Sequence, residues 1–455
     1  MKPLLFTNKD LKKLITPMII EQLLAVLVGM ADTIMVAVVG EAAVASVSLV
    51  DNINILLIGL FTALATGGAV VAGQFLGHRD IKKATTAAEQ LVLFLAVFSV
   101  LIMTVVYLGK WFILHVVFGQ IEPDVMAYAD TYLMIVTASI PFIAIYNAGA
   151  AIFRVQGNSA VSMKVSILMN GINVAGNAVL VLGLHCGVEG VAIPTLVSRI
   201  VAAVIILRLL FDGQLVIHLS KNMRFRFNWG MVGRILRIGI PNGIENSMFQ
   251  LGKLVLLSLI STFGTVAITA NAVSNTVAAF AILPGQAIGM GMVTVVSQCV
   301  GADDYGQVRY YTKKLMKYAI AAMAVTNLLV MAAIPLVTTA YQLSPETARI
   351  TRNILIFHSI CAIIIWTFSF TLPNALRAAN DVRFAMIVSL LSMWFCRIVM
   401  GVVLGAYIGL GVMGVWIAMI LDWCVRSILF LVRYHRGKWE KRYFVNEPDP
   451  DPSKQ

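Results

Sequence analysis

The chain is poor in charged residues. Only 12% of its 455 residues are Asp, Glu, Lys or Arg, while 59% are hydrophobic, and the mean hydropathy is +0.88. Ordinary soluble domains carry about 25% charged residues, so a soluble globular domain is excluded. Apolar runs of about 20 residues recur along the chain, and each is long enough to cross a bilayer as a helix. The alternating pattern of a membrane barrel is absent, and the sequence therefore predicts an all-α polytopic membrane protein.

Several motifs with known chemistry are also missing. The 5 cysteines form no CxxC pair and no cluster with histidine, so we expect no zinc site and no redox motif. No GxxxxGK[ST] sequence occurs, and direct coupling to ATP is not expected. No constellation of catalytic side chains stands out, so we predict neither an enzyme activity nor a cofactor. The net charge of +12 is explained by basic loops beside a membrane, and nucleic acid is not an expected partner.

Twelve apolar spans can be assigned along the chain. They begin near Leu11, Val47, Glu89, Val125, Ala160, Val188, Leu236, Asn271, Thr312, Thr347, Arg383 and Gly411. Most of the 34 lysines and arginines lie in alternate loops, which the positive-inside rule assigns to the cytoplasm. We therefore expect a monomer that crosses the inner (plasma) membrane many times, with the lipid bilayer around it and both termini in the cytoplasm.

The two halves of the chain resemble each other. A shift of 224 residues places Pro17, Glu21, Gly40, Gly67, Gln74, Gly77 and Asp80 on Pro241, Glu245, Gly264, Gly291, Gln298, Gly301 and Asp304. Six helices separate equivalent positions, so the pattern predicts two six-helix lobes related by a pseudo-two-fold axis along the membrane normal. The predicted segments are an N-lobe at 1–210, a cytoplasmic linker at 211–233, a C-lobe at 234–434 and a disordered cytoplasmic tail at 435–455.

One acid stands deep inside the first apolar span. A carboxylate such as Asp32 costs about 2.5 to 3.5 kcal/mol at the centre of a bilayer, so it needs a proton, a cation or a partner. Asn173, Asn177 and Thr195 lie at a similar depth in the fifth and sixth spans, and the two asparagines share a helix face. The second half keeps none of these polar groups, and its corresponding residues are Leu256, Cys396, Met400 and Met419. We predict a site for a proton or a small cation; the alternative is that the amides and the hydroxyl only join helices.

Two glutamates and one lysine are further candidates. Glu21 and its repeat partner Glu245 lie near the cytoplasmic ends of the lobes, where they either attract cations into a substrate cleft or fix a loop. Lys253 places a base close to the position equivalent to Asp32, and it acts either as an internal counter-charge or as a snorkelling lysine. Asp51 lies at the outer start of the second span, and we expect it to be solvated.

A second charged group lies in the last two spans. Asp422 and Arg426 are four residues apart in the last span, and Arg397 lies at a similar depth in the eleventh span. This spacing is typical of a structural ion pair on one helix face. We therefore predict that these three residues hold helices together.

In this order and spacing, the polar and turn residues resemble the multidrug and toxic compound extrusion (MATE) family of secondary transporters, from the first span to the last. The matching residues are Pro17 before Asp32, Gly40 after it, the pair Asn173 and Asn177, the stretch 187–195 that ends at Thr195, and Arg154 followed by Gly157 and Asn158. The resemblance implies twelve helices in two lobes. It also implies efflux of organic, often cationic, compounds driven by inward sodium or protons.

The resemblance also implies roles for single residues. Asp32, Asn173, Asn177 and Thr195 correspond to the cation-linked site, with possible sodium binding at the first three, and Pro17 corresponds to the bend of the first helix. The substrate-cleft candidates are Glu21, Glu245, Phe249, Gln250 and Lys253. Asn177 matches the NorM type of the family, whereas the acid that this type carries in the tenth span is missing here.

These observations lead to one functional prediction and one alternative. The chain is predicted to be a secondary active multidrug efflux transporter, which exports small organic compounds, cationic or amphipathic, in exchange for protons or sodium by alternating access. The alternative is a flippase for lipid-linked oligosaccharides or other lipids, within the same multidrug/oligosaccharidyl-lipid/polysaccharide flippase superfamily. Lys253, Arg397 and Arg426 keep that alternative open because a phosphate head group needs basic partners.

Overall fold

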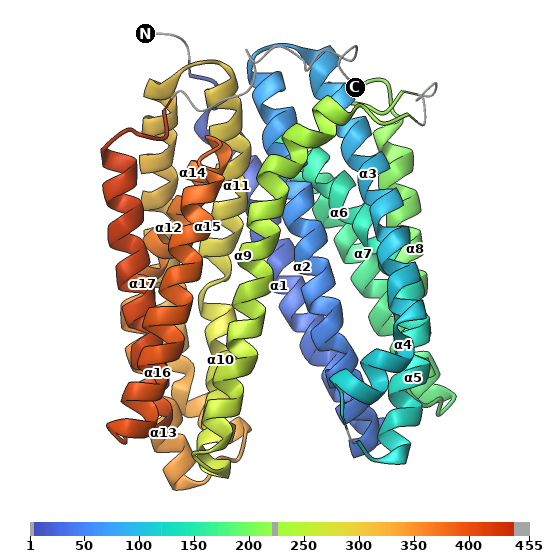
Figure 1. The fold of residues 1–455 in the computed structure, drawn as a ribbon, viewed down its shortest axis with the longest axis vertical. Coiled ribbons are helices and arrows are strands. Elements are labelled where there is room, and N and C mark those ends of the chain that lie inside the picture. The colour runs from blue at the N-terminus through green and yellow to red at the C-terminus, as the bar shows by residue number, and fades with distance from the viewer. Residues whose placement is uncertain (1–3, 120, 221–225, 441–455) are drawn as a thin grey trace. The chain divides into compact units, whose positions relative to one another are not determined.

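The computed structural model describes residues 4–119, 121–220 and 226–440, and within these ranges the chain forms helices and no strand. Figure 1 shows their order along the chain. The first half contains α1 (Asn8–Val39), α2 (Glu41–Gly77), α3 (Ile81–Leu108), α4 (Lys110–Phe112), α5 (Pro123–Ala138), α6 (Ile140–Val155), α7 (Ser159–Asn177) and α8 (Glu189–Leu210), with the π-helical segments η1 (Ile113–Val117) and η2 (Ala178–Gly183).

The second half is also helical throughout its described residues. It contains α9 (Trp229–Ser261), α10 (Thr265–Ala281), α11 (Leu283–Gly301), α12 (Tyr305–Ala340), α13 (Pro345–Cys361), α14 (Leu372–Ala378), α15 (Val382–Leu391), α16 (Met400–Val402) and α17 (Gly411–His435). Three π-helical segments interrupt it, namely η3 (Ala362–Thr371), η4 (Ser392–Val399) and η5 (Val403–Tyr407). A π-helical segment carries an extra residue in its turn and is frequent at functional sites.

The helices account for the twelve predicted spans. Ten of them, counted over the described residues, are long and apolar enough to cross a membrane, and α5 with α6 forms an eleventh span that is bent by 43°. The twelfth is α9, which has 33 residues and carries charged groups along much of its length, namely Arg234, Arg237, Glu245 and Lys253. The 17-residue α10 leads directly into α11. The chain is therefore an all-α protein with twelve spanning segments, as the sequence predicts.

The chain packs as two compact units. Within the described residues, one consists of residues 12–243 and is called the N-terminal unit here; the other consists of residues 4–11 and 244–440 and is called the C-terminal unit. The division falls inside α1 and α9, after Leu11 and after Gly243, whereas the sequence places the lobe boundaries at 210 and 234. The predicted boundaries follow the loops, whereas the observed units divide within two helices.

The N-terminal unit includes the polar connection after α8. The backbone N–H of Ile217 donates to Gln156 Oε1 at 3.0 Å, and the backbone N–H of Asn228 donates to Gln90 Oε1 at 2.9 Å. The start of α9 then lies close against α2, because a Cβ added to Gly67 would be 2.7 Å from the carbonyl oxygen of Ile235. Ile217, Asn228 and the first turns of α9 are thus held against the other helices of this unit.

The C-terminal unit holds both ends of the described chain. The backbone N–H of Phe6 donates to Tyr311 Oη at 2.9 Å, and Arg309 Nε donates to Glu440 Oε1 at 2.9 Å. Trp439 is buried and stacks on Tyr434. The start of the predicted disordered tail, 435–440, is therefore anchored through Trp439 and Glu440, while His435, Arg436 and Lys438 are exposed. The rest of the predicted disordered tail, 441–455, lies outside the described residues.

Candidate functional site

Four predicted residues of the N-terminal unit meet in one chain of hydrogen bonds. Asn177 Nδ2 donates to Asp32 Oδ1 at 2.7 Å and to Asn173 Oδ1 at 3.3 Å, and Asn173 Nδ2 donates to Thr195 Oγ1 at 3.0 Å. The four side chains come from α1, α7 and α8, which are far apart in the sequence. The structure thus brings together Asp32, Asn173, Asn177 and Thr195, which we call the N-site.

Helix packing and burial shape the N-site. A Cβ added to Gly176 would be 2.7 Å from Pro194 Cβ, so α7 and α8 approach closely beside the two asparagines. Asn177 is 0% exposed, and its Oδ1 has no hydrogen-bond partner among the described residues. Asp32 and Thr195 are only partly buried. The N-site therefore combines a reachable carboxylate with a buried, unused acceptor oxygen, which is the kind of oxygen group that binds a hard cation.

Three further charged or polar side chains lie beside the N-site, and their contacts were not predicted. Tyr132 Oη donates to Asp51 Oδ1 at 3.2 Å, so Asp51 is bonded and partly buried rather than solvated as we expected. Arg199 Nη1 donates to Ser139 Oγ at 2.7 Å, and its guanidinium is close enough to interact electrostatically with Asp32 and Asp51. Two carboxyl groups thus share one guanidinium, so Arg199 can balance the charge of only one of them. The signal in the sequence was an acid and an arginine inside apolar spans.

Glu21 and Glu245 occupy equivalent ion pairs. Arg154 Nη2 lies 2.6 Å from Glu21 Oε1 in the N-terminal unit, and Arg377 Nη2 lies 2.7 Å from both carboxylate oxygens of Glu245 in the C-terminal unit. Both glutamates are buried, at 5% and 7% exposure. Tyr146 and Ser162 complete the shell of Glu21. These contacts favour the structural interpretation, and a role of either glutamate in the substrate path stays a prediction.

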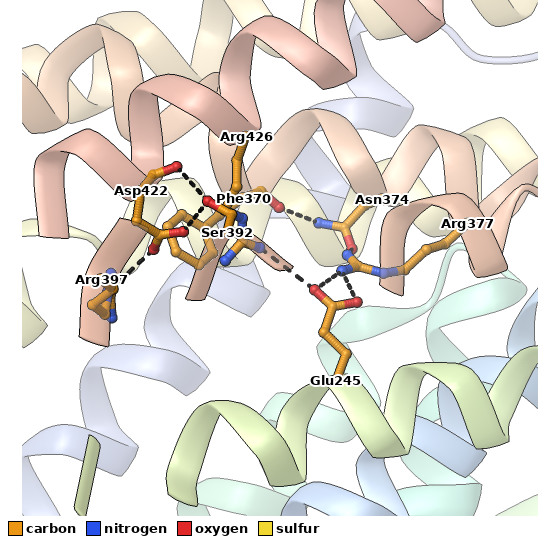
Figure 2. Close-up of polar contacts among 8 residues, drawn as sticks. All are labelled: Glu245, Phe370, Asn374, Arg377, Ser392, Arg397, Asp422 and Arg426. Atoms are coloured by element: carbon orange, nitrogen blue, oxygen red, sulfur yellow. Dashed lines mark hydrogen bonds and ion pairs between the residues drawn. The ribbon is translucent and has the colours of Figure 1, made fainter. Parts of the chain in front are cut away.

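A second polar cluster fills the interior of the C-terminal unit, as Figure 2 shows. Asp422 Oδ2 lies 3.1 Å from Arg397 Nε, and Asp422 Oδ1 accepts from Ser392 Oγ at 2.5 Å. Arg426 Nη2 reaches Glu245 Oε1 at 3.5 Å. Asp422 therefore forms its ion pair with an arginine of another segment and not with Arg426 four residues away. Ser392 and Arg397 both belong to the π-helical segment η4.

Aromatic rings line this cluster. Lys253 Nζ and the Arg397 guanidinium carbon each lie 5.0 Å from the centroid of the Phe249 ring, and the Arg426 guanidinium carbon lies 4.4 Å from the centroid of Phe370. Lys253 is exposed and has no ion-pair partner among the described residues. The predicted role of Lys253 as an internal counter-charge therefore stays a prediction. Gln250, which follows Phe249 in the chain, is partly buried.

The remaining predicted positions have simpler surroundings. Pro17 is buried inside α1, which continues as one helix from Asn8 to Val39. No group of three or more His, Cys, Asp or Glu side chains that could hold a metal ion occurs in the described part of the chain. A sodium ion at the N-site would instead depend on one carboxylate together with amide and hydroxyl oxygens.

Comparison with known proteins agrees with this architecture. A model of the MatE family matches residues 17–179 and again residues 241–403. The two matches begin 224 residues apart, which confirms the internal duplication predicted from the sequence.

Relatives and solved structures cover nearly the whole chain. The "Uncharacterized transporter YisQ" of Bacillus subtilis is 28% identical over 454 residues, with 96% of this chain and 99% of that protein covered. The "Probable multidrug resistance protein NorM" of Thermotoga maritima is 26% identical over 445 residues, with 96% and 94% covered. A solved outward-facing multidrug resistance MATE family transporter has a TM-score of 0.89 at 20% identity, with 96% and 97% covered. The chain, a multi-pass membrane transporter, belongs to the MatE family.

Proposed function

We propose that this chain is a secondary active efflux transporter, which exports organic compounds in exchange for protons or sodium by alternating access. Its substrates are small amphipathic or cationic molecules, it works as a monomer in the plasma membrane, and both termini face the cytoplasm. The observation that carries the proposal is the N-site, in which Asp32 is bonded to Asn177 beside a buried acceptor oxygen. The family membership and the name of the Thermotoga maritima relative support efflux of several compounds.

The N-site provides a way to couple an ion to the shape of the unit. The hydrogen bond from Asn177 to ionised Asp32 is charge-assisted, and it weakens when a proton neutralises the carboxylate. A sodium ion would instead compete for the same carboxylate oxygens and add Asn177 Oδ1 as a ligand. In either case the bonds between α1 and α7 change with the bound ion. Pro17 leaves one backbone hydrogen bond of α1 unmade, which lets this helix bend in response.

The test is transport of a fluorescent organic cation and a fluorescent organic anion in vesicles that contain the purified protein. Sodium and pH gradients are imposed separately, so that the gradient that drives efflux identifies the coupling ion. Asp32→Asn is expected to abolish gradient-driven transport while the protein remains folded and monodisperse. Asp124→Asn, which changes an exposed acid of the same unit, is the matched control. Full transport by Asp32→Asn would refute the proposal.

The flippase alternative is favoured by one observation, the guanidinium cluster of the C-terminal unit. Phosphate head groups are bound by arginine pairs of this kind. Transfer of a fluorescent phospholipid between leaflets, measured with and without the ion gradients, separates the two functions. Lipid transfer by the wild-type protein without export of either soluble probe would replace the efflux proposal.

A further inference from the structure

The charges inside the C-terminal unit do not balance. Glu245 and Asp422 are the two carboxylates in the cluster of Figure 2, and they face three guanidinium groups, those of Arg377, Arg397 and Arg426. Lys253 adds a fourth cation, which lies on the Phe249 ring as Arg397 does, and it has no acidic partner among the described residues. The cluster therefore carries an excess of two positive charges.

The duplication shows which of the four cationic residues the repeated fold does not require. Glu245 and Arg377 repeat the pair of Glu21 and Arg154, which is complete by itself in the N-terminal unit. The fold therefore needs one glutamate and one arginine at these positions. Lys253, Arg397 and Arg426 have no charged counterpart in the first half, where the repeat places Gly29, Val174 and Ala202.

Burial raises the free-energy cost of this excess positive charge. Arg397 is 3% exposed and Arg426 is 2% exposed, and the Nε–H groups of both lack an aligned hydrogen-bond acceptor among the described residues. Asp422 Oδ2 lies near Arg397 without an aligned hydrogen bond. Two carboxylates cannot neutralise three guanidinium groups, and an uncompensated buried charge destabilises a protein strongly. A bound anion would therefore remove part of this cost. The aromatic contacts of these cations lower the cost but do not cancel the charge.

The face of α9 leads from this interior to an accessible residue. Glu245, Phe249 and Lys253 follow at intervals of four, so they lie on one helix face. Exposure rises along it, from buried Glu245 through partly buried Phe249 to exposed Lys253. Lys253 and Arg397 are close enough to repel each other across the Phe249 ring. An anion that entered beside Lys253 would meet both cations before it reached Arg426.

The aromatic groups define the rest of the ligand. Phe370 stacks on Trp366 with 5.0 Å between centroids and meets Phe249 edge-on at 6.1 Å. These rings provide an apolar wall directly behind the cations. A guanidinium pairs best with a carboxylate, sulfonate or phosphate, which offer two oxygens at once.

We propose that the C-terminal unit contains a binding site for an amphipathic organic anion, with Lys253, Arg397 and Arg426 binding its acidic group and Phe249 and Phe370 contacting its apolar body. The inference rests on the proposed function in one respect, since the bound anion is taken to be the exported substrate. It narrows the substrates from amphipathic or cationic compounds to amphipathic compounds with an acidic group. A free organic acid and an anionic phospholipid share this chemistry.

The test is equilibrium binding of three dansyl probes to the full-length protein in an uncharged detergent. Dansylglycine is an anion, dansylamide is neutral and dansylcadaverine is a cation, and all three share one aromatic body. The anion is expected to bind about tenfold more tightly than the cation, as one charge-assisted contact implies. Equal affinity of the two charged probes would overturn the proposal.

Variants of exposed lysines keep the test independent of folding. Lys253→Gln is expected to weaken dansylglycine binding about tenfold without changing dansylamide binding, and Lys253→Arg is expected to preserve it. Lys317→Gln, on the exposed side of α12 in the same unit, is the matched control. If Lys253→Gln and Lys317→Gln bind dansylglycine alike, the site does not exist where we place it.

Competition identifies the source of the anion. Displacement of dansylglycine by 2-naphthoate but not by dihexanoyl-phosphatidylglycerol supports a free organic acid, and the reverse result supports an anionic lipid. Both results support an anion site. Because binding is measured without any ion gradient, its outcome does not depend on whether Asp32→Asn abolishes transport. Failure of this inference and failure of the proposed function are therefore distinguishable.

Discussion

Neutralising one of the two equivalent glutamates tests how much each ion pair contributes to the fold. Glu245→Gln removes the charge opposite Arg377 and Arg426, so two guanidinium groups lose a carboxylate. Glu21→Gln removes the charge opposite Arg154 only. Tyr146, which donates to Glu21, can still donate to the new amide oxygen. The same chemical change should therefore destabilise the C-terminal unit more than the N-terminal unit.

The size of the effect follows from burial. Both glutamates are at least nine-tenths buried, and breaking a buried ion pair by removing one partner costs about 3 to 5 kcal/mol. A change of 1 kcal/mol shifts the melting temperature of a unit of 150 to 250 residues by about 2 to 4 °C. We expect Glu21→Gln, at about 3 kcal/mol, to lower the melting temperature by about 6 to 12 °C, and Glu245→Gln, at about 5 kcal/mol, by about 10 to 20 °C.

Tryptophan fluorescence during heating of the detergent-solubilised protein measures these shifts. Trp366 and Trp423 lie in contact with Phe370 and report directly on the C-terminal cluster. Glu122→Gln changes an exposed glutamate and serves as the control. In a double variant that also carries Arg377→Gln, the melting temperature should fall by less than the summed falls of the two single variants, because the double variant leaves fewer unpaired charges. A Glu245→Gln protein that melts within about 2 °C of the wild type would refute the reasoning.

Three further predictions concern the transport cycle and the packing. Export of one anion in exchange for one inward monovalent cation moves two charges, so a potential of 100 mV should drive dansylglycine export with about 4.6 kcal/mol. Exchange of one cation for another moves no net charge, so the potential should not change any export of dansylcadaverine; equal responses of the two probes in valinomycin-clamped vesicles would contradict this. Asp51→Asn should slow gradient-driven efflux severalfold without abolishing it, since Asp32 keeps the hydrogen bond from Asn177. A loss of transport as complete as that of Asp32→Asn would show that the two acids do not differ in their roles. Gly414→Ala places a Cβ 2.6 Å from the Leu404 carbonyl carbon and should cost about 1 to 3 kcal/mol in thermal unfolding, whereas Gly233→Ala, with no atom within 4 Å, should not destabilise.

Much of the fold and of the N-site could be predicted from the sequence. Asp32, Asn173 and Asn177 each interrupt an apolar span, and each differs from its repeat partner, so they stand out in hydropathy and in the repeat. Their spacing on α7 and their similar depth then place them together. The hydrogen bonds between them agree with that reasoning.

The C-terminal cluster could not be predicted in the same way. The spacing of Asp422 and Arg426 indicates a pair within one α-helix, but Asp422 lies against Arg397 of another segment. The direction of Arg397 depends on the π-helical segment η4, whose wider turn rotates the side chains that follow it. Neither hydropathy nor repeat alignment reports such a local change in helix geometry. Asp51 was misjudged for a related reason, because its partner Tyr132 comes from a different helix.

The repeated glutamate–arginine pairs also separate what the two halves share from what each half has alone. Glu21 with Arg154 and Glu245 with Arg377 stand at equivalent repeat positions, whereas Asp32 stands opposite Leu256 and Lys253 opposite Gly29. An assembly of two identical halves would carry every acid and every base twice. A single chain with two repeats lets each half carry a charge of its own sign.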